Sequence, residues 1–496
     1  MKKRIIVNAA VIVKLFLIYF IMVSIQSCKQ DFVTTEPTVD FPADVKTVFN
    51  TTYNATNNTC TSAGCHSSEN RAAGLDLVNW QNTMAGSNNG TMVIPYNGFW
   101  SHLTSTINSD TNLAPVSQVF TEVHKIDSSK VHTVINWINS GAPNQNGEVA
   151  NQTFTNKAFI TNQATDLIAV VNTDNQTVTR MFSVGGRSNI LDAPHYITTD
   201  PQKHFIYVSL IQEGYIEKYD INTFQLTGRM SAGLNPAHIV ISPDGNTGFV
   251  TNFDAGGTEK YTKKFSTTSM TILDTATDLK MKAPHGMAIS NDGNFIYVTS
   301  QISEWIFKIN TSDMSIVLDN SIDVSVPPSG NGTGNFKPYQ VILSPDNSKL
   351  YVTCVSSNQV RVYNSSDLSF IQSISVGPNP LLLKFSRDGQ LIFVCNRNPV
   401  NPSDPASGSV SVINASTNSV STTFSEIGVQ PHGVDFTADG QYGIIACETQ
   451  SGQDGHHPTV GSYKIGITRF IRMSDLSLLP RKVEMGSFPA GVTTNP

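Results

Sequence analysis

The strongest constraint on the fold is a repeat that begins near residue 158 and continues to the end of the sequence. Each unit starts at a proline, passes through an alternating strand into a tight turn such as "SPDG", and continues into a second strand rich in Ile, Val, Phe and Tyr. A hairpin such as "QVRVYNSSDLSFIQSISV" completes the unit. Proline fixes φ at the second turn position, while Asp and Gly accommodate the reversal. Four antiparallel strands per unit are typical of a β-propeller blade.

The number of units predicts a ring of seven blades. The last unit stops after one strand, and the three strands that it lacks are present in residues 158–184. We therefore predict a mainly β protein in which residues 158–496 form a seven-bladed β-propeller, closed by pairing of the last strand with the first blade. The units resemble the YVTN-type propeller family, which implies the fold but not one function, since such propellers serve as oxidoreductases, lactonases and binding platforms. The unit prolines are Pro194, Pro236, Pro284, Pro338, Pro380, Pro431 and Pro489.

The side chains that follow these prolines are expected on one face of the ring, where the longer insertions also lie. Imidazoles that converge on an axis could bind copper or zinc. Because the units that carry the Pro-His pairs are spread around the ring, we expect a ligand-lining or structural role for these side chains rather than a metal site. The ligand-face candidates are His195, His238, His285, Tyr339 and His432, with His456 and His457 from the last insertion.

A region of different texture precedes the repeat and carries the cluster "CTSAGCH" at residues 60–66. Apolar residues at helical spacing predict a helix over residues 128–139, which ends before Gly141. Outside the cytoplasm, such a cluster could be a haem attachment site, a short disulfide with a bystander histidine, or part of a zinc site. A second cysteine pair that would complete a zinc site is missing from this region.

The order of this cluster, "GLDL", "VIP" and a terminal "WINSGAP" resembles the small c-type cytochrome domain of exported proteins of Bacteroidetes and Planctomycetes. The resemblance implies an all-α domain with one covalent haem c, in which Cys60 and Cys65 form the thioether bonds and His66 binds the iron from one side. Four residues separate the cysteines, instead of the usual two, and the family's distal methionine is missing. His124 is the nearest replacement for it, and two histidine ligands imply a lower reduction potential than histidine with methionine.

The N-terminus has the pattern of an export signal, with three basic residues before a mostly apolar stretch that ends in "SIQSC". This ending resembles the lipobox of bacterial lipoproteins, which implies lipidation of Cys28 and a membrane anchor. An uncleaved signal anchor is the alternative. The following "CKQD" resembles the surface-export tag of Bacteroidetes lipoproteins, so we expect an exported outer-membrane lipoprotein at the cell surface or on the periplasmic side. A net charge of −6 without a basic run after the first four residues gives no sign of a nucleic-acid partner.

The predicted organisation leads to a function with alternatives. We predict an electron-transfer protein whose propeller binds a substrate, a protein partner or a second redox centre. One alternative is a non-enzymatic binding or adhesion propeller with a disulfide-tied N-terminal module, and another is a lactonase-like hydrolase, whose family the "PHG" and "IYV" strings also resemble. The sequence contains no recognisable catalytic constellation. The expected segments are a signal peptide (1–27), a tether (28–42), a cytochrome-like domain (43–144), a linker (145–157) and the propeller (158–496).

Overall fold

The computed structural model describes residues 39–496, apart from residues 53–57, 115–123, 255, 257, 259, 324–333, 399–407, 450–463 and 496. Within this range, Asp40–Pro496 is one compact unit. The predicted signal peptide, the lipidation site at Cys28 and the candidates His456 and His457 lie outside the described residues. In the described part of the chain, no helix has the length and apolar character needed to cross a membrane.

The larger part of the structure consists of five four-stranded antiparallel sheets and one eight-stranded sheet. The first four-stranded sheet combines the last strand of the chain, β28 (Pro489–Thr494), with β1 (Lys157–Asn162), β2 (Leu167–Asn172) and β3 (Thr177–Ser183). The other four take their strands in chain order: β4 (Pro194–Thr199), β5 (Phe205–Leu210), β6 (Tyr215–Asp220) and β7 (Leu226–Ser231); β8 (Pro236–Ile241), β9 (Thr247–Asn252), β10 (Tyr261–Ser266) and β11 (Thr271–Thr277); β12 (Pro284–Ile289), β13 (Phe295–Ser300), β14 (Trp305–Asn310) and β15 (Ile316–Ser321); β16 (Pro338–Leu343), β17 (Lys349–Cys354), β18 (Gln359–Asn364) and β19 (Phe370–Ser375).

The eight-stranded sheet corresponds to two blades that share one long strand. Strand β23 pairs with β22 as far as Gly428 and with β24 from Val429 onward. It is therefore the outer strand of one blade and the inner strand of the next, and the sheets together make seven blades. The strands of this sheet are β20 (Pro380–Phe385), β21 (Leu391–Asn396), β22 (Gly408–Asn414), β23 (Ser419–Phe436), β24 (Tyr442–Thr449), β25 (Ile465–Arg472) and β26 (Ser477–Leu478), and β27 (Val483–Ser487) also pairs with β25.

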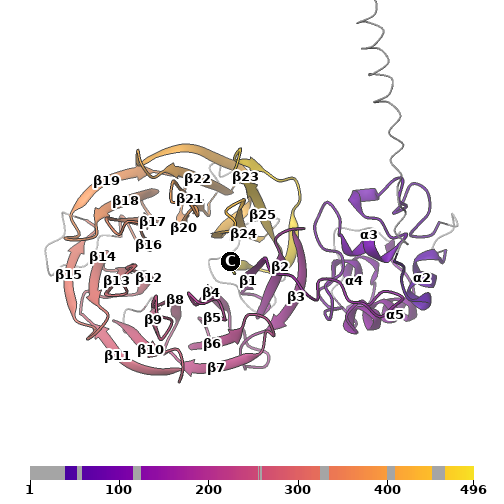
Figure 1. Ribbon diagram of the computed structural model, residues 1–496, viewed down its shortest axis with the longest axis horizontal. Coiled ribbons are helices and arrows are strands. Elements are labelled where there is room, and N and C mark those ends of the chain that lie inside the picture. The colour runs from indigo at the N-terminus through magenta and orange to yellow at the C-terminus, as the bar shows by residue number, and fades with distance from the viewer. Residues whose placement is uncertain are drawn as a thin grey trace, which may run out of the picture. The chain divides into compact units, whose positions relative to one another are not determined.

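The blades surround a central axis, as Figure 1 shows: β4, β8, β12 and β16 lie nearest the centre, and β7, β11, β15 and β19 lie at the rim. The ring is closed by the pairing of β28 with β1, in which Ala158 lies opposite Thr494. The structure thus confirms the closure that the incomplete last unit predicts. Closure leaves the inner strand of this blade hydrogen-bonded, which protects a sheet edge from pairing with other chains.

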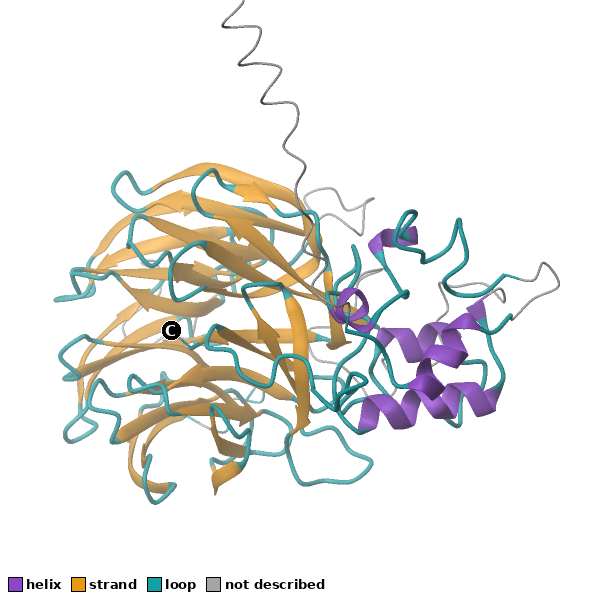
Figure 2. Ribbon diagram, turned by 45° about the vertical axis from the view of Figure 1, so that its right-hand side comes forward, coloured by secondary structure: helices purple, strands orange, loops and turns teal. Residues whose placement is uncertain are grey.

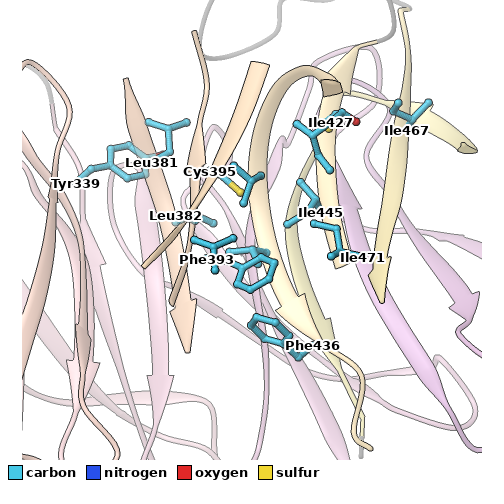
Figure 3. Packing of buried hydrophobic residues seen from close by; sticks show 14 residues of the cluster. Tyr339, Leu381, Leu382, Phe393, Cys395, Ile427, Phe436, Ile445, Ile467 and Ile471 are labelled. Carbon is cyan, nitrogen blue, oxygen red and sulfur yellow. Dashed lines mark hydrogen bonds between the residues drawn. The ribbon is translucent and has the colours of Figure 1, made fainter. Parts of the chain in front are cut away.

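Apolar side chains fill the space between neighbouring blades. Figure 3 shows one such cluster, in which Leu381 and Phe393 from β20 and β21 pack with Ile445 and Ile467 from β24 and β25. These residues are at most 3% exposed. The alternating Ile, Val and Phe residues of the repeat therefore form the contacts between blades, which explains why every unit carries them.

The helices of the described residues lie in the N-terminal part of the chain (Figure 2). Helix α5 has the bounds that the apolar spacing predicts, and its buried Val134 and Ile138 face the same core as Val45 and Phe49. Phe41 makes edge-on contacts with the rings of Phe49 and Trp137. The helices are α2 (Ala43–Asn50), the 3-10 helix η1 (Ala72–Gly74), α3 (Trp80–Met84), α4 (His102–Ile107) and α5 (Ser128–Asn139). We call residues 40–144 the helical module.

The helical module contacts the propeller directly. The backbone N–H of Val178 in β3 donates to the hydroxyl of Thr91 at 2.6 Å, and Nδ1 of His102 lies 2.9 Å from a carboxylate oxygen of Glu484 in β27. Ile94 belongs to the apolar cluster that β1, β2 and β27 form with their neighbours. The predicted linker, residues 145–157, therefore does not keep the two parts away from each other. Strand β1 begins at Lys157, the last residue of that linker.

Candidate functional site

The helical module contains a cavity of about 60 Å³ with mainly apolar walls. Sites for small molecules and cofactors are typically lined in this way. The apolar lining comes from η1 and the chain after it and from α4. The lining residues that matter here are Leu75, Leu77, Met92, Leu103, Ile107, Cys60, His66, His102 and His124.

Two histidines lie opposite each other in this cavity. The ring centroids of His66 and His124 are 6.3 Å apart, and the ring planes are inclined by 48°. A metal–imidazole bond is about 2 Å long, and the ring centre lies about 1 Å beyond the bonded nitrogen. Two rings on opposite sides of one ion therefore have their centroids about 6 Å apart. The spacing of His66 and His124 therefore fits two ligands of one metal ion.

The protonation state of His66 is also the one that a metal-binding histidine requires. Burial and the neighbouring His124 lower the pKa of His66 below its ordinary value, so the ring is neutral at neutral pH. Neutral imidazole is the form that binds metals. Its Nδ1 is buried and has no hydrogen-bond partner among the described residues. Such an unsatisfied atom destabilises a folded protein unless a ligand engages the ring.

The cysteines lie in a compact turn that brings Cys60 to the same cavity. The backbone N–H of His66 donates to the carbonyl of Cys60, and that of Cys65 donates to the carbonyl of Ser62, each at 3.0 Å. Cys60 and Cys65 are both free thiols, so the disulfide that the sequence leaves open is not present in the structure. Burial raises the pKa of Cys60 to about 11, which keeps its thiol protonated and unreactive at neutral pH.

A second group of candidates lies at the start of the inner strands of the propeller. A ring nitrogen of each of His195, His238 and His285 lies within 4.8 Å of the corresponding atoms of the other two. All three side chains are 1–2% exposed. The sequence analysis expected the ring to hold His195, His285 and His432 apart. Two of these instead meet His238 here, and all three side chains of this group are buried rather than displayed on a ligand face.

A repeated backbone irregularity explains why these side chains meet. The residue before the proline has a positive φ, as at Ala193 (55°) and Gln430 (53°), and a shift in strand register follows, as between Pro194 and Tyr196. An extra residue in a strand changes the direction of the side chains next to it. The inner strands are closest together at the axis, so side chains that turn inward there come from different blades and still touch.

Tyr339 and His432 complete this group. The hydroxyl of Tyr339 lies 3.2 Å from Nε2 of His432, and its backbone carbonyl lies 3.3 Å from Nδ1 of His285. The ring centroids of His432 and His195 are 5.7 Å apart. Tyr196, which the sequence analysis did not single out, stacks on His238 with centroids 4.2 Å apart. Its position next to His195 in the unit was the only signal for it.

Sequence reasoning also missed a buried ion pair. Arg397 follows β21 and Glu448 lies in β24, and an Nη2 of the arginine is 2.7 Å from the carboxylate. Their side chains are 8% and 0% exposed. Both follow the residue that lies opposite the unit proline. Other units carry Ile211, Phe253, Gln301 and Val355 at this position, so a charge there was the available signal.

Comparisons with known proteins identify the larger part of the structure. The chain matches no protein-family model. It is 23% identical over 269 residues to Antigen Lp49 of Leptospira interrogans, which is 50% of this chain and 53% of that protein. The chain thus spans about half the length of this relative.

Two solved structures share the fold. One is a functionally unknown protein from Desulfotomaculum acetoxidans, with a TM-score of 0.52, 11% identity and coverage of 68% of this chain and 99% of that chain. The other is a candidate 6-phosphogluconolactonase from Bacteroides uniformis, with a TM-score of 0.51, 16% identity and coverage of 69% and 100%. The chain contains a β-propeller. At such identities the likeness shows the fold alone, and it says nothing about the helical module.

Proposed function

We propose that this protein is an exported electron-transfer protein with one covalent haem c in the helical module and a propeller that binds its partner or substrate. The observation that carries the proposal is the pair His66 and His124, 6.3 Å apart across an apolar cavity that Cys60 also lines. Haem would supply one-electron chemistry when bound.

Each residue of the cavity has a role in this proposal. His66 and His124 would bind the iron from its two sides, and Cys60 and Cys65 would hold the haem covalently. The apolar wall excludes water, and two histidine ligands favour the ferric state more than histidine with methionine does. Met92 and His102 also line the cavity, but His102 lies 2.9 Å from the carboxylate of Glu484. This contact makes His102 a weaker ligand candidate than His124.

We also propose that Cys28 anchors the protein to the outer membrane. Support comes from the basic and apolar N-terminus before "SIQSC" and from a charged fraction of only 14%, against roughly 25% in average globular proteins. A Cys28→Ala variant should lose its lipid and appear in the soluble fraction of cells.

The test of the haem proposal is an absorption spectrum of the full chain, expressed in a host with the cytochrome c maturation system. We expect a haem spectrum that survives denaturation and organic extraction, with one haem per chain. A variant with both Cys60→Ala and Cys65→Ala should lose haem on extraction. A colourless protein would overturn the proposal.

The distal ligand has its own test. His124→Met should raise the midpoint potential, because a thioether ligand favours ferrous iron. The control is His132→Ala, which changes an exposed residue of α5 whose Nδ1 contacts the carbonyl of Ser128. An unchanged spectrum and potential in His124→Met would exclude His124 as the ligand.

The second candidate is a binding or adhesion propeller with a module that carries no haem. It is favoured by the comparisons, which support the propeller and give no support to a cytochrome domain; the relative from Leptospira interrogans is called an antigen. A lactonase-like hydrolase is a further possibility, because of the fold shared with the candidate lactonase from Bacteroides uniformis. A colourless chain that binds a protein or a cell surface would support the binding propeller, and a colourless chain that hydrolyses a lactone would support the hydrolase.

A further inference from the structure

We propose that His195, His238 and His285 bind one transition-metal ion, Zn²⁺ or Cu²⁺, at the axis of the propeller. This group, which we call the axial histidine site, is separate from the cavity of the helical module and does not depend on haem. Each histidine comes from a different blade, since they lie in β4, β8 and β12.

The spacing of the three rings permits a common ion. One nitrogen of each lies within 4.8 Å of the other two, so a point exists no more than about 2.8 Å from all three, which is 4.8 Å divided by √3. Bonds from zinc to imidazole are about 2.0–2.1 Å long. A shift of about 0.7 Å per ring would therefore bring all three nitrogens to bonding distance, which small changes in side-chain torsion can supply.

The environment of His238 is independent evidence that a metal ion binds at this site. Its side chain is 1% exposed, and neither of its ring nitrogens has a hydrogen-bond partner among the described residues. A buried imidazole whose nitrogens make no hydrogen bond is costly. A metal ion would satisfy one of its nitrogens, and stacking on Tyr196 already holds the ring in place.

The neighbours of the site resemble the outer contacts of metal-binding histidines. Nδ1 of His285 lies 3.3 Å from the carbonyl of Tyr339, which favours the tautomer with the lone pair on Nε2. The ring of Tyr339 lies 3.9 Å from that of His285, and its hydroxyl lies 3.2 Å from Nε2 of His432. These contacts orient His285 and connect it through Tyr339 to His432.

The ligand set indicates the class of metal. Imidazole nitrogens suit zinc and copper, whereas magnesium and calcium require oxygen ligands. Three protein ligands leave a fourth position on a tetrahedral ion. A central cavity of about 330 Å³ is lined by inner-strand residues that include Gln340 and Tyr196, and Tyr196 stacks on His238. The ion would therefore be placed to hold a water or a small ligand at the axis.

The experiment uses the full chain, freed of loosely bound metal by a chelator, mixed with Zn²⁺ or Cu²⁺ and dialysed. We expect elemental analysis to find one zinc or one copper per chain, with iron measured separately. His238→Ala should lower this to trace levels. His204→Ala, which removes an exposed histidine outside the group, should leave it unchanged.

Two further measurements keep the result decisive if His238→Ala fails to fold. The paramagnetic resonance spectrum of the wild-type chain with one Cu²⁺ should show hyperfine splitting from several nitrogens. A variant with both His456→Ala and His457→Ala should retain the metal. The proposal is overturned if no metal remains after dialysis, if His238→Ala binds as much as the wild type, or if only the His456 and His457 variant loses the metal.

Discussion

Replacing Glu448 by glutamine should lower the free energy of unfolding by about 3 to 5 kcal/mol. The carboxylate accepts hydrogen bonds from Nε of Arg397 at 3.1 and 3.2 Å and from Nη2 at 2.7 Å. The two side chains are 0% and 8% exposed. Removing one partner of a buried ion pair typically costs about 3–5 kcal/mol. The loss should affect the two blades that share β23, because β21 and β24 lie in one each.

The double variant Arg397→Met with Glu448→Leu shows whether the cost comes from leaving one charge of the pair buried or from losing the pair as a whole. Well-packed apolar residues often replace a buried ion pair with little loss, so we expect this variant within about 1 kcal/mol of the wild type. Arg472→Met is the control, because Arg472 and its partner Asp475 are 47% and 52% exposed and such pairs contribute about 0–1 kcal/mol. Urea unfolding followed by circular dichroism measures all four proteins. A cost for Glu448→Gln below about 1 kcal/mol, or a double variant as unstable as the single one, would refute the reasoning.

Two further predictions concern the propeller. Burial raises the pKa of Asp166 to about 6, whereas an unfolded carboxyl titrates near 4. Between about pH 4 and 6 the unfolded chain has lost this proton while the folded protein keeps it, so the free energy of unfolding falls as the pH rises, by about 1 kcal/mol after allowing for solvent screening. Asp166→Asn should remove this fall, which urea titrations at both pH values measure; the same fall in the variant would contradict the assignment. Gly433→Ala should destabilise the closed ring by about 1–3 kcal/mol, because its Cβ would lie 1.9 Å from the carbonyl oxygen of Ala490 in β28. Thermal unfolding should show this loss, and Gly186→Ala, whose Cβ would have its nearest neighbour at 3.4 Å, should unfold close to the wild type.

The repeat predicts the inner strands closely, since six of the seven unit prolines begin a strand, as Pro194 begins β4. It does not predict that one strand serves two blades. Pro431 marks a new unit in the sequence, but β23 runs through it without a break, from Ser419 to Phe436. A proline is tolerated there because the register shifts between Pro431 and Gly433, so its missing N–H falls at a bulge.

The candidate sites were predictable to different degrees. The cluster at residues 60–66 was visible as a pattern, and the structure places Cys60, His66 and His124 around one cavity. The positive φ before each unit proline was not visible, because Ala193 and Gln430 are not residues that usually adopt it. That backbone turn, with the bulge after it, brings His195, His238 and His285 together.

The sequence by itself determined the propeller, its closure through β28 and the helix α5, because these follow from local turn chemistry and from the spacing of apolar residues along the chain. Only the tertiary structure decided that His195, His238 and His285 meet, that Arg397 reaches Glu448, and that the helical module contacts β3 and β27. Contacts of this kind depend on the direction in which side chains from distant segments leave their strands. That direction is set by bulges and by the packing of blades around an axis, neither of which a linear pattern of residue types contains.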